Sequence, residues 1–180
     1  MFYSRLPFGG GFKRSSAMAH LRPQFSAAWN RFSEVNVGVE KVGEILGGKV
    51  EANITAGIFE NACPIRMSYV LNYTGVPVPA NSRYATVTGK DKKRYMFRVN
   101  DMMDFLVGAF GQPDLTVTSP KPGSFNGKQG IIVFQGSGWS NARGHVTLWN
   151  GNICSDTCHF LGGAENGSFV PDVASLWILK

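Results

Sequence analysis

The chain has 180 residues, of which 43% are hydrophobic and 17% are charged, and this composition is typical of one globular domain with its own core. No apolar run approaches the roughly 20 residues that a membrane-spanning helix requires, so the sequence predicts no membrane insertion. The net charge of +6 is concentrated before Glu34, and the chain from Glu34 onward is nearly neutral. That part also lacks a basic stripe interleaved with aromatic residues, which argues against a nucleic-acid partner.

Residues 1–21 are rich in Gly, Ser and Arg and show no hydrophobic period, so we expect a disordered leader or an expression remnant there. This stretch also lacks the apolar core and the small-residue cleavage site of a secretory signal peptide. Any export is therefore expected to use another route. The remaining residues, 22–180, are predicted to form a single domain.

Two amphipathic helices are predicted outside the region of the first cysteine. Between residues 33 and 46, valine, isoleucine and leucine recur at helical spacing, and Gly47-Gly48 supplies a stop. Between residues 100 and 110 the same spacing recurs, with Asn100 as the expected N-cap and Gly111 at the exit. We expect both helices to pack their apolar faces on the core.

Cys63 lies at a third predicted helix start. Asn61 is a good N-cap, Pro64 is tolerated only in a first helical turn, and Gly75 suits the exit. A thiol in a first turn faces unpaired backbone N–H groups and the positive end of the helix dipole, which stabilise thiolate over thiol. Cys63 is therefore a candidate nucleophile, although the same position also suits a buried structural cysteine.

The second half of the sequence changes in character. Ile131–Phe134, the run from His145 to Trp149 and Leu176–Leu179 are short, rich in β-formers and bounded by Gly, Asn and Pro, which predicts strands of one sheet. Helices come first and mostly antiparallel strands follow. This order predicts an α+β fold in which N-terminal helices pack on the sheet.

A histidine and an aspartate are predicted to face each other in this sheet. Asn150-Gly151 is the preferred two-residue type I′ hairpin turn, and that turn would pair Trp149 with Asn152 and His145 with Asp156. Directly opposed residues have Cβ atoms about 5 Å apart, so Asp156 could hold the imidazole in one tautomer. This predicts the base and orienting carboxylate of a Cys-His-Asp triad, with a purely structural His–Asp pair as the alternative.

The other two cysteines, Cys154 and Cys158, are four residues apart. Their spacing is not that of paired CxxC knuckles, so zinc is disfavoured and no metal or cofactor is predicted. A disulfide is favoured, with two reduced thiols as the alternative. Residues four apart on a straight strand are about 13 Å apart at Cα, whereas a disulfide needs less than about 7 Å, so the chain must bend near residues 155–157. A bridge would fix the backbone of Asp156 and indicate an oxidising compartment.

Three stretches carry a resemblance to a known family, namely NACPIRMSYVLN (61–72), GWSNARGHVTLWNG (138–151) and ICSDTCH (153–159). From about Arg22 to its end, the chain resembles the fourth family of type VI secretion amidase effectors, which are similar to NlpC-type papain-like cysteine peptidases. The resemblance implies a papain-like fold. Residues 1–21 have no counterpart.

The resemblance also implies a function. Members hydrolyse the bond between γ-D-glutamate and meso-diaminopimelate in the peptide stems of peptidoglycan, and Cys63, His145 and Asp156 match their triad. Cys154 and Cys158 match their disulfide. The type VI secretion apparatus of a donor cell injects these proteins into a rival's periplasm, where a cognate immunity protein blocks the active site.

In the expected mechanism, Cys63 attacks the amide carbonyl while His145 withdraws the thiol proton and later protonates the leaving amine. The backbone N–H of Cys63 is the first candidate oxyanion donor and Asn61 is the second. Three residues near His145 in sequence are expected to line the cleft, namely Trp139, Ser140 and Asn141. Two alternatives stay open: a papain-like transferase or deamidase acting on another acyl compound, and a non-catalytic toxin that binds the cell envelope.

Overall fold

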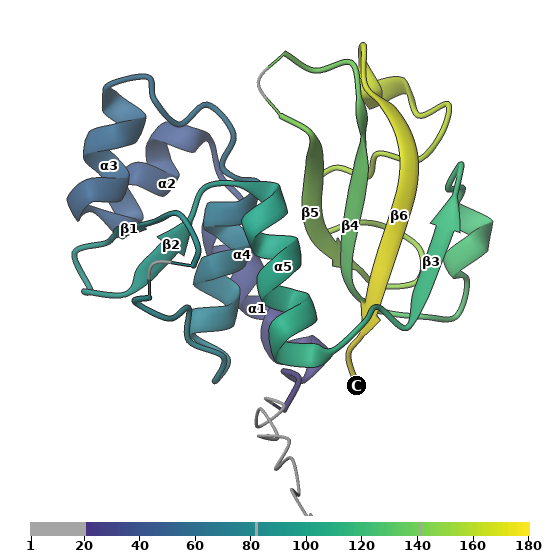
Figure 1. The fold of residues 1–180 in the computed structure, drawn as a ribbon, viewed down its shortest axis with the longest axis horizontal. Coiled ribbons are helices and arrows are strands. Elements are labelled where there is room, and N and C mark those ends of the chain that lie inside the picture. Colours follow the sequence, from purple (N-terminus) through teal and green to yellow (C-terminus); the bar gives the residue numbers. More distant parts are fainter. Residues whose placement is uncertain (1–20, 82, 141) are drawn as a thin grey trace, which may run out of the picture.

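The computed structural model describes residues 21–81, 83–140 and 142–180, so residues 1–20 of the predicted leader lie outside the described residues. Helices form one side of the molecule and an antiparallel sheet forms the other (Figure 1). Within the described ranges, no helix has the length and apolar character needed to cross a membrane. The elements in chain order are α1 (Phe25–Val35), α2 (Val39–Leu46), α3 (Gly48–Thr55), α4 (Cys63–Asn72), β1 (Thr86–Thr88), β2 (Arg94–Met96), α5 (Val99–Phe110), β3 (Leu115–Thr118), the 3-10 helix η1 (Pro122–Phe125), β4 (Gly130–Ser137), β5 (Gly144–Trp149), the 3-10 helix η2 (Ala164–Asn166) and β6 (Val170–Ile178).

The main sheet has the strand order β3-β6-β4-β5, and every neighbouring pair is antiparallel. The three predicted strands therefore do share one sheet, and the α+β prediction is confirmed. Along β4, Ile131 and Val133 pack in the cluster shared with the helices, while Ile132 and Phe134 pack in a second cluster on the other face. Both faces of β4 are covered, which explains why its sequence is an unbroken hydrophobic run.

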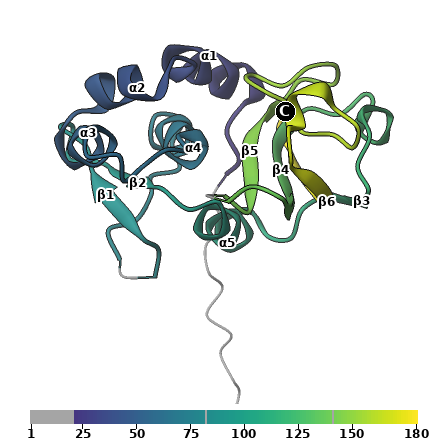
Figure 2. The ribbon, with the colours of Figure 1, turned by 90° about the horizontal axis from the view of Figure 1, so that it is seen from above.

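Helix α4 is buried between its neighbours. Figure 2 shows α1, α4 and α5 along the side of the sheet where β5 lies, with α2 and α3 farther away. Cys63, Met67, Val70 and Leu71 are all fully buried in the same cluster, as their helical spacing predicts. The helix that carries the cysteine is thus held against the sheet that carries His145.

The small hairpin formed by β1 and β2, which the sequence patterns did not predict, holds the other side of α4. The backbone N–H of Met96 donates to Ser68 Oγ (2.9 Å), and Asn72 Nδ2 donates to the Arg94 carbonyl (2.8 Å). Ser68 and Asn72 are buried polar side chains that would be costly without partners. These two bonds explain their presence in a buried helix.

The helix predicted for residues 33–46 is wrong in its extent. Val35 ends α1, a separate helix begins at Val39, and α3 follows directly after α2. Asn36 and Gly38 lie between Val35 and Val39 and interrupt the helix, although the two valines are four residues apart, as on one face of a continuous helix. The predicted stop is confirmed, since Gly47 has a φ of +60° and an added Cβ would meet Lys90. Helix α5 starts at Val99 with Arg98 as its N-cap, not Asn100.

Candidate active site

Helix α4 begins at Cys63, and its N-cap is Ala62, not Asn61 as predicted. Asn61 acts one residue earlier. Its Oδ1 accepts the backbone N–H of Cys63 at 3.0 Å, which is an Asx turn and satisfies one of the unpaired donors of the first turn. Pro64 occupies the first turn, where its missing N–H costs nothing. The local sequence therefore places the buried thiol of Cys63 at the positive end of a helix.

The two residues expected to bind an oxyanion are thus bonded to each other. The Cys63 N–H already has Asn61 Oδ1 as its acceptor, so an oxyanion could use that N–H only after displacing the Asn61 oxygen. Asn61 also lines the pockets beside the nucleophile. Its Nδ2 group is a second donor at the same place.

His145 lies on the edge strand β5, where it pairs with Phe134 of β4. Its Nε2 hydrogen-bonds Asp156 Oδ1 at 3.1 Å. The side chain of Cys63 hydrogen-bonds the same imidazole, and because Nε2 is taken by Asp156, Nδ1 is the nitrogen that faces the sulfur. Sulfur, imidazole and carboxylate from three distant stretches therefore come together in one row.

The charges in this row support one another. Burial by itself would lower the pKa of His145, but the charges and hydrogen bonds of Asp156 and Cys63 outweigh burial and raise it to about 10. Burial likewise acts to raise the pKa of Asp156, and the positive charge and hydrogen bond of His145 reverse this, so that the pKa is lowered. The geometry therefore favours a protonated imidazole between two acceptors.

The hairpin that connects His145 to Asp156 differs from the predicted one. Trp149 pairs with Cys154 instead of Asn152, and Ser155 N–H donates to the Leu148 carbonyl at 2.8 Å. The type I′ turn is wrong because it needs positive φ at both central residues, and only Gly151 has one (φ +96°). The pairing after the turn is shifted by two residues from the predicted one, and because side chains alternate with a period of two, each paired residue keeps its predicted face of the sheet. The type I′ register would place Ile153 on the same face as Val146 and Leu148, but those two residues are buried whereas Ile153 is 53% exposed.

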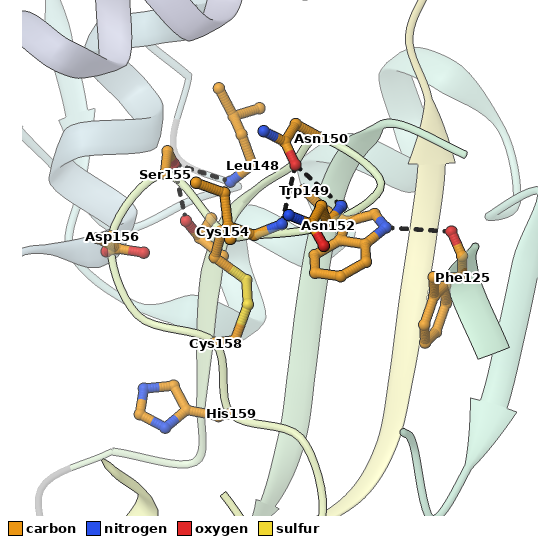
Figure 3. The surroundings of a disulfide bond; sticks show 12 residues. Phe125, Leu148, Trp149, Asn150, Asn152, Cys154, Ser155, Asp156, Cys158 and His159 are labelled. Carbon is orange, nitrogen blue, oxygen red and sulfur yellow. Dashed lines mark hydrogen bonds between the residues drawn. A yellow bond between two sulfur atoms is a disulfide. The ribbon is translucent and has the colours of Figure 1, made fainter. Parts of the chain in front are cut away.

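A disulfide between Cys154 and Cys158 confirms the predicted bridge, with the two Cα atoms 5.3 Å apart. The chain bends between the two cysteines as the spacing required. Figure 3 shows Asp156 on this bend and the ring of His159 next to Cys158. The bend, and not a continued strand pairing, brings Asp156 to His145.

Ser155 anchors the bend to its surroundings. Its Oγ hydrogen-bonds Thr147 Oγ1 (2.9 Å). It also accepts the Leu148 N–H (3.2 Å), a bond that Figure 3 marks with a dashed line. Its carbonyl accepts Asn36 Nδ2 (2.7 Å) from the segment after α1. Thr147 also hydrogen-bonds the Asp156 carboxylate. The carboxylate is therefore held by the sheet, the disulfide and the helical side at once.

Arg66 is a member of the site that the sequence patterns missed. Its Nη1 lies 3.9 Å from Asp156 Oδ2, while Nε and Nη2 donate to the carbonyls of Val35 (3.0 Å) and Val37 (2.6 Å). The guanidinium of Arg66 thus connects helix α4 with the segment between α1 and α2 and with the carboxylate of Asp156. The available signal was its place in helix α4, three residues after Cys63 and on a neighbouring face.

His159 is a second missed residue. It is buried, and its ring lies edge to face with those of His145 (4.7 Å between centroids) and Trp139 (4.8 Å). Asn166 donates to the Phe160 carbonyl through Nδ2, so its Oδ1 accepts from His159 Nδ1 at 3.1 Å. Burial and the nearby charge of His145 lower the pKa of His159 to about 4. His159 is thus a neutral ring packed against His145 at neutral pH.

Two pockets lie near the start of α4 and share Asn61, Trp139 and Ala142 in their linings. The pocket that includes His145, Arg66 and Glu60 has a volume of about 290 Å³ and is here named the His145 pocket. The other, the α5 pocket, has a volume of about 390 Å³, and its lining includes Asn61, Pro64, Arg98, Trp139, Ser140 and Arg143.

The three predicted cleft residues fall in different places relative to these pockets. Trp139 lines both of them, and its ring stacks on Phe169 (4.1 Å between centroids). Ser140 lines the α5 pocket. Asn141 lies outside the described residues. Among the residues that the structure describes, no group of three or more His, Cys, Asp or Glu side chains could hold a metal ion.

Comparisons with known proteins show which family and which solved structures the chain is similar to. A family model described as type VI secretion system amidase effector protein 4 matches residues 59–175. The effector in an effector–immunity complex, Tae4–Tai4 from Enterobacter cloacae, is 69% identical over 89% of this chain and all of its own, with a TM-score of 0.87. The Salmonella typhimurium effector Tae4, bound to an Enterobacter cloacae immunity protein, is 61% identical over 88% of this chain and all of its own, with a TM-score of 0.86.

The Enterobacter cloacae effector by itself is similar too, at 68% identity over 91% of this chain and all of that chain, with a TM-score of 0.84. A search of curated proteins found no match. The family model covers more than half of the chain, and the identities are high over nearly its whole length. The chain therefore belongs to the type VI secretion system amidase effector family 4.

Proposed function

We propose that this chain hydrolyses the amide bond between γ-D-glutamate and meso-diaminopimelate in peptidoglycan peptide stems, with Cys63 as nucleophile, His145 as acid and base, and Asp156 as the orienting carboxylate. The observation that carries the proposal is the hydrogen-bonded row of Cys63, His145 and Asp156 beside two pockets. The membership of an amidase effector family supports the reaction class.

Acylation begins with the Cys63 sulfur, which attacks the γ-carbonyl carbon of D-glutamate. The carbon–sulfur bond forms while the carbonyl electron pair moves onto oxygen, giving a tetrahedral oxyanion. Asn61 Nδ2 is the candidate side-chain donor for that oxygen, and the Cys63 N–H joins it when Asn61 Oδ1 releases its bond. His145 then gives its Nδ1 proton to the amine nitrogen of meso-diaminopimelate as the carbon–nitrogen bond breaks.

Deacylation reverses the roles of the imidazole. His145 takes a proton from a water molecule, and the resulting hydroxide attacks the thioester carbon. The carbon–sulfur bond breaks, the γ-carboxyl group of D-glutamate is released, and sulfur returns to the thiolate beside a protonated His145. Asp156 stabilises the imidazolium in both half-reactions through its bond to Nε2. The buried His159, whose pKa is lowered to about 4, is too weak a base to compete with His145.

The place of action follows from the same family. We infer that a type VI secretion apparatus delivers the chain to the periplasm of a target cell, where its disulfide is compatible with the oxidising environment. We also infer that a cognate immunity protein covers the cleft. The similar effectors from Enterobacter cloacae and Salmonella typhimurium form complexes with immunity proteins, which supports this partner.

The substitution Cys63→Ala tests the function. Purified peptidoglycan is incubated with each protein, and the released fragments are identified by mass spectrometry. The wild type is expected to produce stems that end in D-glutamate and fragments with a new meso-diaminopimelate amine. The variant is expected to lose at least about 10⁴-fold in turnover, because the nucleophile is gone. It should keep a cooperative unfolding transition, since the substitution removes a single sulfur atom.

Three outcomes would contradict the proposal. Cleavage by Cys63→Ala at the wild-type rate would remove Cys63 from the mechanism. Transfer of the glutamyl group to an added amine, or release of ammonia without cleavage of stems, would indicate a transferase or a deamidase. Toxicity in a periplasm that survives the substitution His145→Ala would indicate a binding toxin.

A further inference from the structure

The α5 pocket lies next to the start of α4, the helix that begins at Cys63. Asn61 and Pro64, which flank Cys63 in sequence, form part of its lining, and Arg98 and Trp139 contribute from other elements. It shares the wall of Asn61, Trp139 and Ala142 with the His145 pocket. A volume of about 390 Å³ is in the range of sites that hold a small ligand or a few residues of a peptide. A substrate whose scissile bond lies at Cys63 can therefore reach into this pocket.

The charge of this pocket has one sign. Among the described residues that line it, the charged ones are Arg98 and Arg143, and both are exposed. In residues 21–81, 83–140 and 142–180, neither guanidinium forms an ion pair with a carboxylate. The Arg98 guanidinium lies over the ring of its neighbour Phe97, 5.5 Å from the centroid. Arg66, by contrast, uses its donors on Val35, Val37 and Asp156.

Two arginines without a carboxylate partner among the described residues make this pocket favourable for an anion. The guanidinium group stays charged at every physiological pH, and its planar fork matches the two oxygens of a carboxylate. With no anion present, the two like charges repel each other, and an entering carboxylate relieves this repulsion. The first turn of α5, which follows Arg98, lines the same pocket and contributes a potential of the same sign.

The substrate of the proposed reaction carries such anions next to the bond that breaks. Because D-glutamate is linked through its γ-carboxyl group, its α-carboxylate stays free, on the carbon two methylenes from the scissile carbonyl. The meso-diaminopimelate residue on the other side of the bond has a free carboxylate at the far end of its side chain. An ordinary α-linked peptide has no carboxylate at the first of these positions.

We propose that the α5 pocket is a carboxylate-binding subsite in which Arg98 and Arg143 hold a free carboxylate of the peptide stem and so select acidic stems over amidated ones. This inference rests on the proposed function and adds the specificity of the site. Neither arginine belongs to the catalytic row, so their contribution is to substrate binding.

Three synthetic stems test the subsite: an acidic stem of L-alanine, γ-D-glutamate and meso-diaminopimelate, one with the D-glutamate α-carboxylate converted to an amide, and one with the distal meso-diaminopimelate carboxylate converted to an amide. Each is cleaved by the wild type, Arg98→Gln, Arg143→Gln and the control Arg83→Gln, an exposed arginine outside the pocket. The wild type should prefer the acidic stem by about 10-fold or more in kcat/KM, mainly through KM.

The variants should lose this preference selectively. Arg98→Gln and Arg143→Gln should each lower kcat/KM on the acidic stem by about 10- to 100-fold and leave one of the two amidated stems unchanged. The amidated stem whose rate no longer responds to the substitution identifies which carboxylate is held. Arg83→Gln should behave as the wild type on all three stems. Unfolding transitions that overlap with the wild type would show that both variants are folded.

The possible failures are distinguishable. If the wild type cleaves all three stems equally well, or if the arginine variants lose the same factor on acidic and amidated stems, the subsite is refuted while the hydrolase function stands. If the wild type cleaves none of the stems, the proposed function itself is refuted, and the subsite with it.

Discussion

The two sides of the active site are built in different ways. Cys63 is placed by its immediate neighbours in sequence, because the Asn61 side chain accepts its N–H and Pro64 permits the first turn of α4. His145 and Asp156 need contacts of several kinds: the pairing of β5 with β4, the short-range disulfide next to Asp156, and a long-range bond from Asn36 to the Ser155 carbonyl. The helical side is therefore local, and the sheet side depends on the closure of the whole domain.

This difference indicates where the site is vulnerable. A helix start stays in place as long as its few local contacts persist, whereas the carboxylate of Asp156 needs the bend, the sheet and Arg66 at the same time. Substitutions on the sheet side should therefore change stability and turnover together. Cys63→Ala on the helical side should abolish turnover and leave the fold intact.

The largest effect on the sheet side is expected from Asp156→Asn. The amide keeps the shape but loses the charge that stabilises the His145 imidazolium, so turnover should fall about 10²- to 10⁴-fold. The rate of stem cleavage followed by mass spectrometry measures this fall. Asp104→Asn, at an exposed position of α5, is the matched control and should keep the wild-type rate. An Asp156→Asn rate within a few-fold of the wild type would contradict the role of the carboxylate.

Removal of the disulfide is expected to have the next largest effect. The double substitution Cys154→Ser with Cys158→Ser should lower the free energy of unfolding by about 2 kcal/mol, because the unfolded chain regains the freedom of a short loop. It should also lower turnover about 10-fold as Asp156 loses its fixed backbone. Urea unfolding and stem cleavage measure the two changes. Loss of stability with unchanged turnover would show that Ser155 and Asn36 hold the bend without the disulfide.

The two buried histidines predict that stability is greatest near pH 6.5. His145 binds its proton more tightly when folded, so its contribution is lost as pH rises from about 6.5 through about 10. His159 binds its proton more weakly when folded, so stability also falls as pH drops from about 6.5 toward about 4. Each slope is at most about 1.4 kcal/mol per pH unit. Urea unfolding at several pH values measures both.

Two variants separate the acidic decline in stability from the alkaline one. His159→Gln should flatten the acidic decline and leave the alkaline one. Cys63→Ala should weaken the alkaline decline, because the charge of Cys63 is one of the causes that raise the pKa of His145. A stability that is independent of pH between 5 and 9 would contradict both assignments.

The smallest effect is expected from Arg66→Lys, which tests the link between the two sides. Lysine keeps the positive charge near Asp156 but cannot donate to the Val35 and Val37 carbonyls in the same fork. The free energy of unfolding should fall by about 1 kcal/mol and turnover by a few-fold. Urea unfolding and stem cleavage are again the measurements, with Arg31→Lys, at a partly exposed position of α1, as control. An unchanged stability would show that the guanidinium is not a structural link.

Local patterns in the sequence determined much of this protein. The start of α4 follows from Pro64 and the polar Asn61 near it, the end of α2 from Gly47, and the strands from short β-rich runs. In each case the deciding contacts lie within a few residues, so the chain's own spacing carries the information. The disulfide could also be predicted, because the distance between Cys154 and Cys158 is limited by the short chain between them.

Only the tertiary structure decided the hairpin and the surroundings of the triad. The pair of His145 and Asp156 was predicted through a type I′ turn that is absent, and the contact exists because the disulfide bend returns the chain to β5. Arg66 gained its place through Asp156, which is far away in sequence. His159 gained its place through Asn166, 7 residues farther along the chain, and through Trp139, which lies before β5. Such contacts depend on which surfaces meet when helices and sheet pack, and no local period encodes that choice.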